Sequence, residues 1–235
     1  MTQFLSEITN EAGFNLSDRQ LNQFSTYANL LVEWNEKMNL TAITQNCEIA
    51  TKHFADSLYG MKFIKDAKTL IDVGTGAGFP GLPLKIATPS LSLTLLDSLN
   101  KRLNFLNTVV DELNLSDVTT VHSRAEDGAT IGSSLRESFD VAVSRAVANL
   151  SVLCEYCLPY VKLGGVFLAY KGSEVEDELA ESQNAIETLG GEVEGIFKYT
   201  IPKTDITHSI VVIKKVKNTP VKYPRQGGKI QKKPL

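Results

Sequence analysis

A short apolar run that ends in a glycine-rich turn is the feature that most constrains the fold of this chain. Residues 69–73 read Thr-Leu-Ile-Asp-Val, and Gly74, Gly76 and Gly78 follow. Such a run is typical of a buried parallel strand, and glycines directly after it predict a tight turn. Glycine has no Cβ, so a ligand can approach the main chain there, while backbone amides of the turn and of the next helix supply hydrogen-bond donors. Pro80 and Pro83 are tolerated only before or in a first helical turn, so this helix is expected to begin near Gly81.

The spacing of the glycines distinguishes between two kinds of nucleotide site. Counted from Gly74, a dinucleotide fingerprint needs a glycine at the position of Phe79; counted from Gly76 the spacing fits, but the turn then starts two residues beyond the strand. An acidic residue two before the first glycine, Asp72, with glycine at every second position is typical of S-adenosylmethionine-dependent methyltransferases. Asp72, Gly74, Gly76 and Gly78 are therefore candidates for cofactor binding. A tight turn without a ligand is the alternative.

A second acidic residue follows the next predicted strand. Residues 91–96 form this strand, and Asp97 ends it, 23 residues after Gly74. At a spacing of roughly 20 residues, a carboxylate at the end of the second strand reaches the ribose hydroxyls of a bound nucleotide. Asp97 is therefore predicted to bind the cofactor ribose.

Strands and helices alternate after the turn, as in a doubly wound α/β sheet. Further strands are predicted at 118–121, 139–143 and 166–170, with helices at 101–113 and 174–189. The last two predicted strands, 193–199 and 209–215, have no helix between them and should pair antiparallel. We predict a class I methyltransferase sheet, Rossmann-like and with a final antiparallel strand. This ending disfavours the dinucleotide fold, which continues strand, helix, strand.

Polar residues follow five of these strands. Open α/β sheets bind ligands outside the carboxyl ends of their strands, so Gly74, Asp97, Glu126, Arg145 and Lys171 are expected to lie along one edge of the sheet. This convergence is the main argument from sequence for a site.

Residues 1–60 are predicted to form a helical extension that packs on the core. A short helix stops near Gly13, and Ser17 then opens a second helix as its N-cap, with Gln20 placed for a capping box. A third helix is expected over 48–59, where Lys52, His53 and Asp56 fall on neighbouring turns. For His53, a buried hydrogen-bonded role and a functional role are equally compatible with the pattern.

The composition is that of a globular protein. The chain has 235 residues, 43% of them hydrophobic, enough for one domain of residues 61–217 with extensions. Its first residues lack the features of a leader, and no apolar run reaches the roughly 20 residues that span a bilayer, so we expect a cytoplasmic protein without membrane contact. The three cysteines argue against a disulfide framework; Cys154 and Cys157 lie in an apolar helix and are expected to pack in the core, and no metal site is predicted.

Charge is distributed unevenly along the chain. The net charge is −3, yet residues 214–235 carry eight basic residues and no acidic one. A basic segment on an acidic body predicts a polyanionic partner, although a solvated tail is an equal alternative. We expect residues 218–235 to form a flexible tail.

Several motifs together resemble one family. In order they are LLVEWNEKMNLTAIT, KHFADS, DVGTGAGFPGLPL, LLDSLNKRLNFL, SRAE, VSRAVANL, YKG and HSIVVIKK, spread over nearly the whole chain. They resemble the bacterial ribosomal small-subunit methyltransferase G family, also called glucose-inhibited division protein B. The resemblance implies methylation of guanine N7 in the 530 loop of 16S ribosomal RNA with S-adenosylmethionine, on free RNA or on the small subunit.

Site residues are carried over from this resemblance by matching motif. It implies that Gly74 and Phe79 line the cofactor pocket, that Ala125 and Glu126 flank the adenine, and that Arg145 completes the site as the catalytic residue. The alternative for Arg145 is a structural ion pair with Asp140 or Glu126. We add His53, Lys171 and Arg225 as candidates for RNA contacts. Many family members end soon after the last strand, so the tail from Asn218 is not expected to be essential.

The chemistry suits these residues. The sulfonium of S-adenosylmethionine is an activated methyl donor, and guanine N7 carries a lone pair and no proton, so positioning suffices and no general base is required. Enzymes that methylate exocyclic amines place Asp or Asn, two prolines and an aromatic after the fourth strand, whereas this chain has Ser-Arg-Ala-Val at 144–147. Two alternatives stay open: a cofactor-binding ribosome assembly factor without turnover, and a nicotinamide-dependent oxidoreductase. We expect a monomer.

Overall fold

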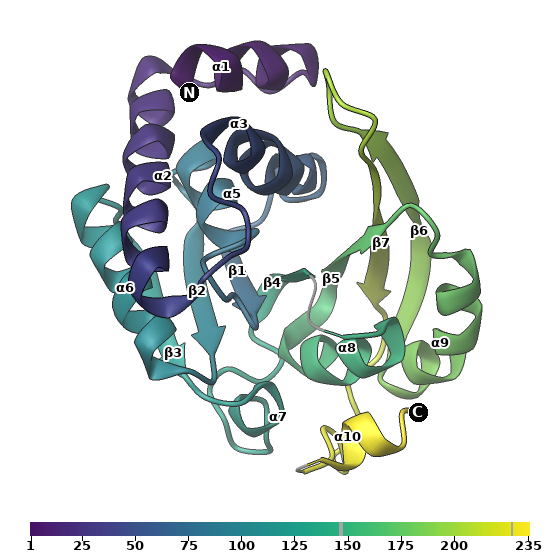
Figure 1. Ribbon diagram of the computed structural model, residues 1–235. Coiled ribbons are helices and arrows are strands. Elements are labelled where there is room, and N and C mark those ends of the chain that lie inside the picture. The colour runs from purple at the N-terminus through teal and green to yellow at the C-terminus, as the bar shows by residue number, and fades with distance from the viewer. Residues whose placement is uncertain (146–147, 227) are drawn as a thin grey trace.

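A seven-stranded sheet with helices on both faces forms the body of the protein (Figure 1). The computed structural model describes residues 1–145, 148–226 and 228–235. Ala146 and Val147, which belong to the motif VSRAVANL and to the run Ser-Arg-Ala-Val after the fourth predicted strand, lie outside the described residues, as does Gly227 of the C-terminal segment.

The order of the strands confirms the predicted fold class. Along the sheet the order is β3-β2-β1-β4-β5-β7-β6. The first five strands are parallel, and β7 runs antiparallel to both of its neighbours. The dinucleotide fold instead has the order 3-2-1-4-5-6. The strand bounds are β1 Thr69–Val73, β2 Ser92–Asp97, β3 Val118–His122, β4 Phe139–Arg145, β5 Val161–Gly172, β6 Gly191–Thr200 and β7 Thr207–Lys215.

The helices follow the predicted alternation after the first strand. Their bounds are α1 Thr2–Glu11, α2 Asp18–Met38, α3 Asn46–Glu48, α4 Asp56–Leu58, α5 Gly81–Ala87, α6 Asn100–Glu112, α7 Ala125–Gly128, α8 Leu150–Cys157, α9 Glu176–Thr188 and α10 Lys229–Lys232, with short 3₁₀ segments at Tyr59–Phe63 and Leu158–Tyr160. Within the described part of the chain, none of these helices has the length and apolar character needed to cross a membrane.

The N-terminal helices contain one feature that the sequence pattern did not indicate. The capping box of Ser17 and Gln20 is confirmed. The helix expected over 48–59, however, is a π-helix from Ile49 to Ala55 between two single α-turns. The Thr51 and Ser57 hydroxyls donate to carbonyl oxygens four residues earlier. These side chains compete with backbone amides for the same carbonyl oxygens, which distorts the helix.

Two apolar layers cover the two faces of the sheet. Side chains alternate along β1, so Leu70 faces the layer formed by α1, α2, α5 and α6, while Ile71 and Val73 face α8 and α9. Residues such as Phe24 and Leu31 of α2 are fully buried in the first layer. Cys154 and Cys157 are fully buried, unpaired thiols in the second layer.

The C-terminal segment folds back onto the second layer below α8 (Figure 1). Tyr223 and Ile230 are buried there. Arg136 donates hydrogen bonds of 2.8 Å to the carbonyl oxygens of Thr219 and Tyr223. Many basic residues suggested a flexible tail, but the apolar residues between them give the segment a packed side. The division of the chain at residues 60 and 217 stays a prediction.

Two glycines with positive φ differ in how closely other side chains pack around them. Gly13 and Gly78 both have positive φ, of +85° and +99°, but a Cβ on Gly13 would meet nothing within 4 Å, whereas one on Gly78 would collide with the Tyr27 hydroxyl and lie 2.7 Å from Leu82. We expect Gly13→Ala to lower the free energy of unfolding by about 1 kcal/mol and Gly78→Ala by about 3 kcal/mol, measured by urea denaturation. Equal losses in the two variants would contradict the packing argument.

Candidate functional site

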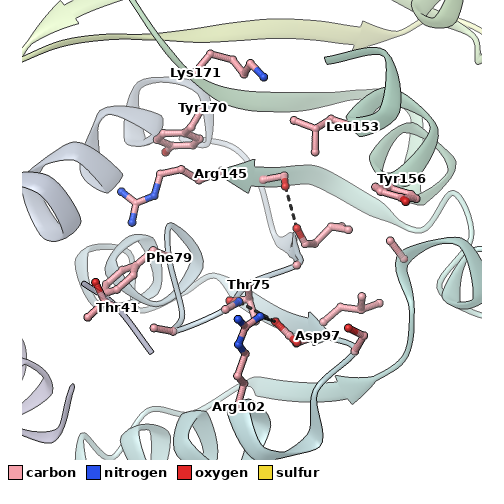
Figure 2. A pocket seen from close by; sticks show the side chains of 18 of the residues that line it. Thr41, Thr75, Phe79, Asp97, Arg102, Arg145, Leu153, Tyr156, Tyr170 and Lys171 are labelled. Carbon is pink, nitrogen blue, oxygen red and sulfur yellow. Dashed lines mark hydrogen bonds and ion pairs between the residues drawn. The ribbon is translucent and has the colours of Figure 1, made fainter. Parts of the chain in front are cut away.

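A cavity of about 910 Å³ opens at the carboxyl ends of the parallel strands. This volume lies within the range of roughly 300–1,000 Å³ that is typical of ligand pockets. The turn after β1 and the ends of β2, β4 and β5 form its floor, and N-terminal residues form one wall (Figure 2). Nine of the predicted site residues line it: His53, Gly74, Gly76, Phe79, Asp97, Ala125, Glu126, Arg145 and Lys171. Asp72, Gly78 and Arg225 do not.

The glycine turn presents its backbone to this cavity. Gly74 and Gly76 have φ of +71° and +60°, in the left-handed region. A Cβ on Gly76 would meet nothing within 4 Å, so open space adjoins the backbone there. The Gly76 amide donates to Asp97 Oδ2 at 2.9 Å, and the Leu99 amide donates to Asp97 Oδ1 at 2.8 Å. Arg102 Nη1 also donates to Oδ2 at 3.4 Å. Asp97 therefore joins the turn to the end of β2 and still has acceptor capacity on Oδ1.

Asp72 holds the same turn from below. Its carboxylate is fully buried, and Oδ2 accepts 2.8 Å hydrogen bonds from the Thr75 hydroxyl and the Gly81 amide. Oδ1 has no hydrogen-bond partner within the described structure. Burial raises the pKa of Asp72 from 3.8 to about 6. Gly78 also faces inward, because the Tyr27 side chain lies against it. These two residues shape the turn without lining the cavity.

One half of the cavity suits a nucleoside. Leu96, Ala125, Leu153 and Tyr156 give it apolar walls, and the Asp97 carboxylate lies at its inner end. In Figure 2, Leu153 and Tyr156 lie on the opposite side of the cavity from Arg145. A flat apolar base between such walls and a ribose hydroxyl donating to a carboxylate are the contacts that a nucleotide cofactor needs. The residues present therefore fit an adenosine group.

The other half is polar and centres on a buried ion pair. Arg145 Nη1 lies 2.6 Å from Asp56 Oδ2, and the side chains are 15% and 2% exposed. Asp56 Oδ1 also accepts from the Tyr199 hydroxyl at 2.8 Å and lies 2.7 Å from His208 Nδ1. Burial opposes ionisation of Asp56, but the hydrogen bond to His208 and the charge of Arg145 hold its pKa below the ordinary value. Arg145 is thus ion-paired, but with Asp56 rather than with Asp140 or Glu126.

His53 connects this ion pair to the glycine turn. Its ring stacks on Phe79 with centroids 4.4 Å apart and planes inclined by 15°. Burial, reinforced by the charge of Arg145, lowers the His53 pKa to about 4, so the imidazole is neutral at pH 7. Its Nε2 lies 2.9 Å from the Thr41 hydroxyl. The Arg145 guanidinium carbon lies 5.1 Å from the centre of the same Phe79 ring, in cation-π range.

The other two candidates for RNA contacts have internal partners. Lys171 Nζ lines the cavity but pairs with Glu178 at 2.7 Å and donates to the Ala148 carbonyl at 3.1 Å. Arg225 does not line the cavity and forms an ion pair with Glu155. An RNA role for these residues stays a prediction.

Several cavity residues were not predicted from the sequence. Tyr199 is the second-last residue of β6 and His208 the second residue of β7, and these two residues face each other in the antiparallel pair. Because β7 runs against its neighbours, its first residues lie at the edge where the parallel strands end. A histidine at the start of a predicted antiparallel strand is the signal that could have located this part of the site.

Comparisons with known proteins agree with this geometry. A family model described as "rRNA small subunit methyltransferase G" matches residues 20–207. A "Ribosomal RNA small subunit methyltransferase G" of Clostridium botulinum (strain Eklund 17B / Type B) is 56% identical over 227 residues, covering 96% of this chain and 95% of the relative. A relative of the same name from Alkaliphilus metalliredigens is 55% identical over the same shares of both chains.

Solved structures support the fold. TYW2 of M. jannaschii in complex with AdoMet has a TM-score of 0.53 at 13% identity, covering 69% of this chain and 76% of that one. A SAM-dependent O-methyltransferase of Thermotoga maritima has a TM-score of 0.51 at 16% identity, covering 81% and 73%. At these identities the likeness concerns the fold alone.

The raised pKa of Asp72 makes stability depend on pH. The folded state keeps a proton that the unfolded chain loses, so ionisation between about pH 4 and 6 lowers the free energy of unfolding, by about 3 kcal/mol. Asp72→Asn keeps an acceptor for the Gly81 amide and removes the charge. We expect this variant to lack the decrease, measured by urea denaturation at pH 4 and 6.5. Asp111→Asn, an exposed carboxylate on α6, serves as the control. If the free energies of unfolding of wild type and Asp72→Asn differed by the same amount at pH 4 and at pH 6.5, this explanation would be contradicted.

Proposed function

This chain belongs to the rRNA small subunit methyltransferase G family, and we propose that it methylates guanine N7 in the 530 loop of 16S ribosomal RNA. It is an S-adenosylmethionine-dependent rRNA methyltransferase, and RNA is its substrate. The observation that carries the proposal is the division of one cavity into an apolar nucleoside half and a polar half around Arg145. The first half fits the cofactor, and the second is left for the target base.

Five of the predicted residues have a role in the cofactor half. Asp97 would accept hydrogen bonds from the ribose hydroxyls, and Ala125 and Glu126 would flank the adenine. The turn at Gly74 and Gly76 would lie against the bound cofactor. Open space adjoins the backbone of Gly76 and leaves room for this contact. When bound, S-adenosylmethionine supplies an activated methyl group. The protein then has to hold a nucleophile in line with that methyl carbon.

The polar half is arranged to position a base rather than to deprotonate one. Asp56 is committed to three donors, and His53 is neutral, stacked and hydrogen-bonded. Guanine N7 has no proton to lose, so a site without a free general base suffices. Arg145 is held between Asp56 and Phe79, and its guanidinium would bind an acceptor edge of the base or an adjacent phosphate.

The setting of the reaction follows from the substrate. The ribosomal small subunit is the polyanionic partner that the basic C-terminal segment led us to expect. We place the protein in the cytoplasm with that substrate. It would act as a monomer, since residues of one chain form both halves of the cavity.

Removal of the Asp97 carboxylate tests the cofactor half. We expect Asp97→Ala to weaken binding of S-adenosylmethionine by between about tenfold and a hundredfold, because ribose hydroxyls lose a charged acceptor. Isothermal titration calorimetry measures this affinity. Asp127→Ala, an exposed carboxylate on α7, should bind as wild type does. An unaltered affinity in Asp97→Ala would contradict the ribose role.

The reaction itself is tested with small subunits from a strain that lacks this gene. They are incubated with the protein and labelled S-adenosylmethionine, and the RNA is then cleaved with borohydride and aniline, which cut at N7-methylguanine. We expect one new cleavage, in the 530 loop. Label without cleavage would retain the methyltransferase but reject N7, and an absence of label on subunits and free RNA would favour an assembly factor.

The same assay tests Arg145. We expect Arg145→Ala to fold, because Asp56 keeps Tyr199 and His208 as partners, and to lose at least about a hundredfold in methyl transfer. Lys203→Ala, which removes an exposed cation that pairs with Glu7, should keep wild-type activity. Wild-type turnover by Arg145→Ala would remove this residue from the site.

A further inference from the structure

The C-terminal segment is anchored to α8 by a buried ion pair. Glu155 of α8 is fully buried, and its carboxylate faces Arg225. Arg225 Nη2 donates to Oε2 at 2.6 Å, Nε donates to Oε1 at 2.9 Å, and the Arg225 backbone amide donates to Oε1 at 2.7 Å. A guanidinium fork on a carboxylate fixes the direction of both side chains. The backbone at Arg225 is thereby held against α8 as well.

The chain beyond Arg225 is also attached. Arg225 Nη1 donates to the carbonyl oxygen of Lys233 at 2.9 Å, which closes a loop between these two residues. Ile230, in the middle of this loop, is fully buried among the residues that pack on α8. A surface tail whose only role was to carry positive charge would not need a buried apolar residue. The loop therefore has a defined position relative to α8.

This position brings α10 to the edge of the cavity. Gln231 lines the same cavity as Tyr156, Glu126 and Arg124. Burial and the Glu126 carboxylate raise the pKa of the Tyr156 hydroxyl, so it is protonated and can act as a donor at the cavity wall that Gln231 also lines. In Figure 2, Tyr156 lies across the cavity from Arg145, on the side assigned to the adenine.

We propose that residues 225, 226 and 228–235 are part of the cofactor site, with α10 forming the outer wall of the adenine end and the Glu155–Arg225 ion pair acting as its positioning element. This inference rests on the proposed function, since it takes the nucleoside half of the cavity as the place of the adenine. The family model ends at residue 207, whereas a relative from Clostridium kluyveri aligns with 99% of this chain. Gln231 would supply a side-chain amide beside the base, and the loop would limit access of water to it.

Two neighbouring residues of α10 provide a matched test. Both side chains are exposed, but Gln231 lines the cavity and Lys232 does not. Isothermal titration calorimetry with S-adenosylmethionine and S-adenosylhomocysteine is the measurement. We expect Gln231→Ala to weaken both ligands severalfold and deletion of residues 228–235 to weaken both by about tenfold, with Lys232→Ala as wild type. Arg225→Lys keeps the positive charge but not the forked guanidinium. It should weaken binding of both ligands by less than the deletion does.

Stability is measured in parallel, because loss of Ile230 or of the ion pair lowers the melting temperature by itself. A lowered melting temperature with unchanged affinity in Gln231→Ala and in the deletion would overturn the proposal and leave the segment a cover of the α8 layer. Unchanged cofactor affinity with weaker binding to small subunits would also overturn it, in favour of phosphate contacts. Failure of the wild-type protein to bind either ligand would reject the cofactor assignment as a whole.

Discussion

The hydrogen bonds that Asp72 makes beneath the glycine turn are the constraint on which the remaining structure depends. One carboxylate oxygen joins the end of β1, the turn and the first residue of α5, since it accepts from Thr75 and from the Gly81 amide. Within the same turn, the Gly76 amide donates a hydrogen bond to the Asp97 carboxylate at the end of β2. Two strands, one helix and the cavity floor are thereby fixed by two carboxylates. The buried charge of Asp72 costs stability at neutral pH, which a fold can tolerate at a functional site.

Asp56 has a comparable role on the other side of the cavity. It binds Arg145 from β4, Tyr199 from β6 and His208 from β7, so its carboxylate connects the N-terminal helices to three strands. A buried carboxylate is stable only with such partners, and each partner loses its orientation if the carboxylate is absent. The polar half of the cavity is therefore a property of the assembled domain and not of one motif.

Much of the sheet could be predicted because its central strands are buried on both faces. Such strands appear in the sequence as apolar runs bounded by glycine or polar residues, and each predicted strand has a counterpart. The bounds were less accurate where local signals conflict with pairing. β5 begins at Val161 rather than 166, since Gly164 and Gly165 suggested a break, yet Val161 pairs with Phe139 across an irregular ladder. The π-helix of residues 49–55 also has no simple periodic signature.

The sequence by itself determined the fold class, the glycine turn and the residues that follow parallel strands, because those features depend on neighbours in the chain and on one topological rule. Tertiary structure alone decided which partner each charge has. Arg145 pairs with Asp56, and Arg225 with Glu155, across separations of 89 and 70 residues. Local charge patterns do not encode such separations, because burial and the packing of distant elements decide whether a basic residue meets solvent, RNA or a buried carboxylate.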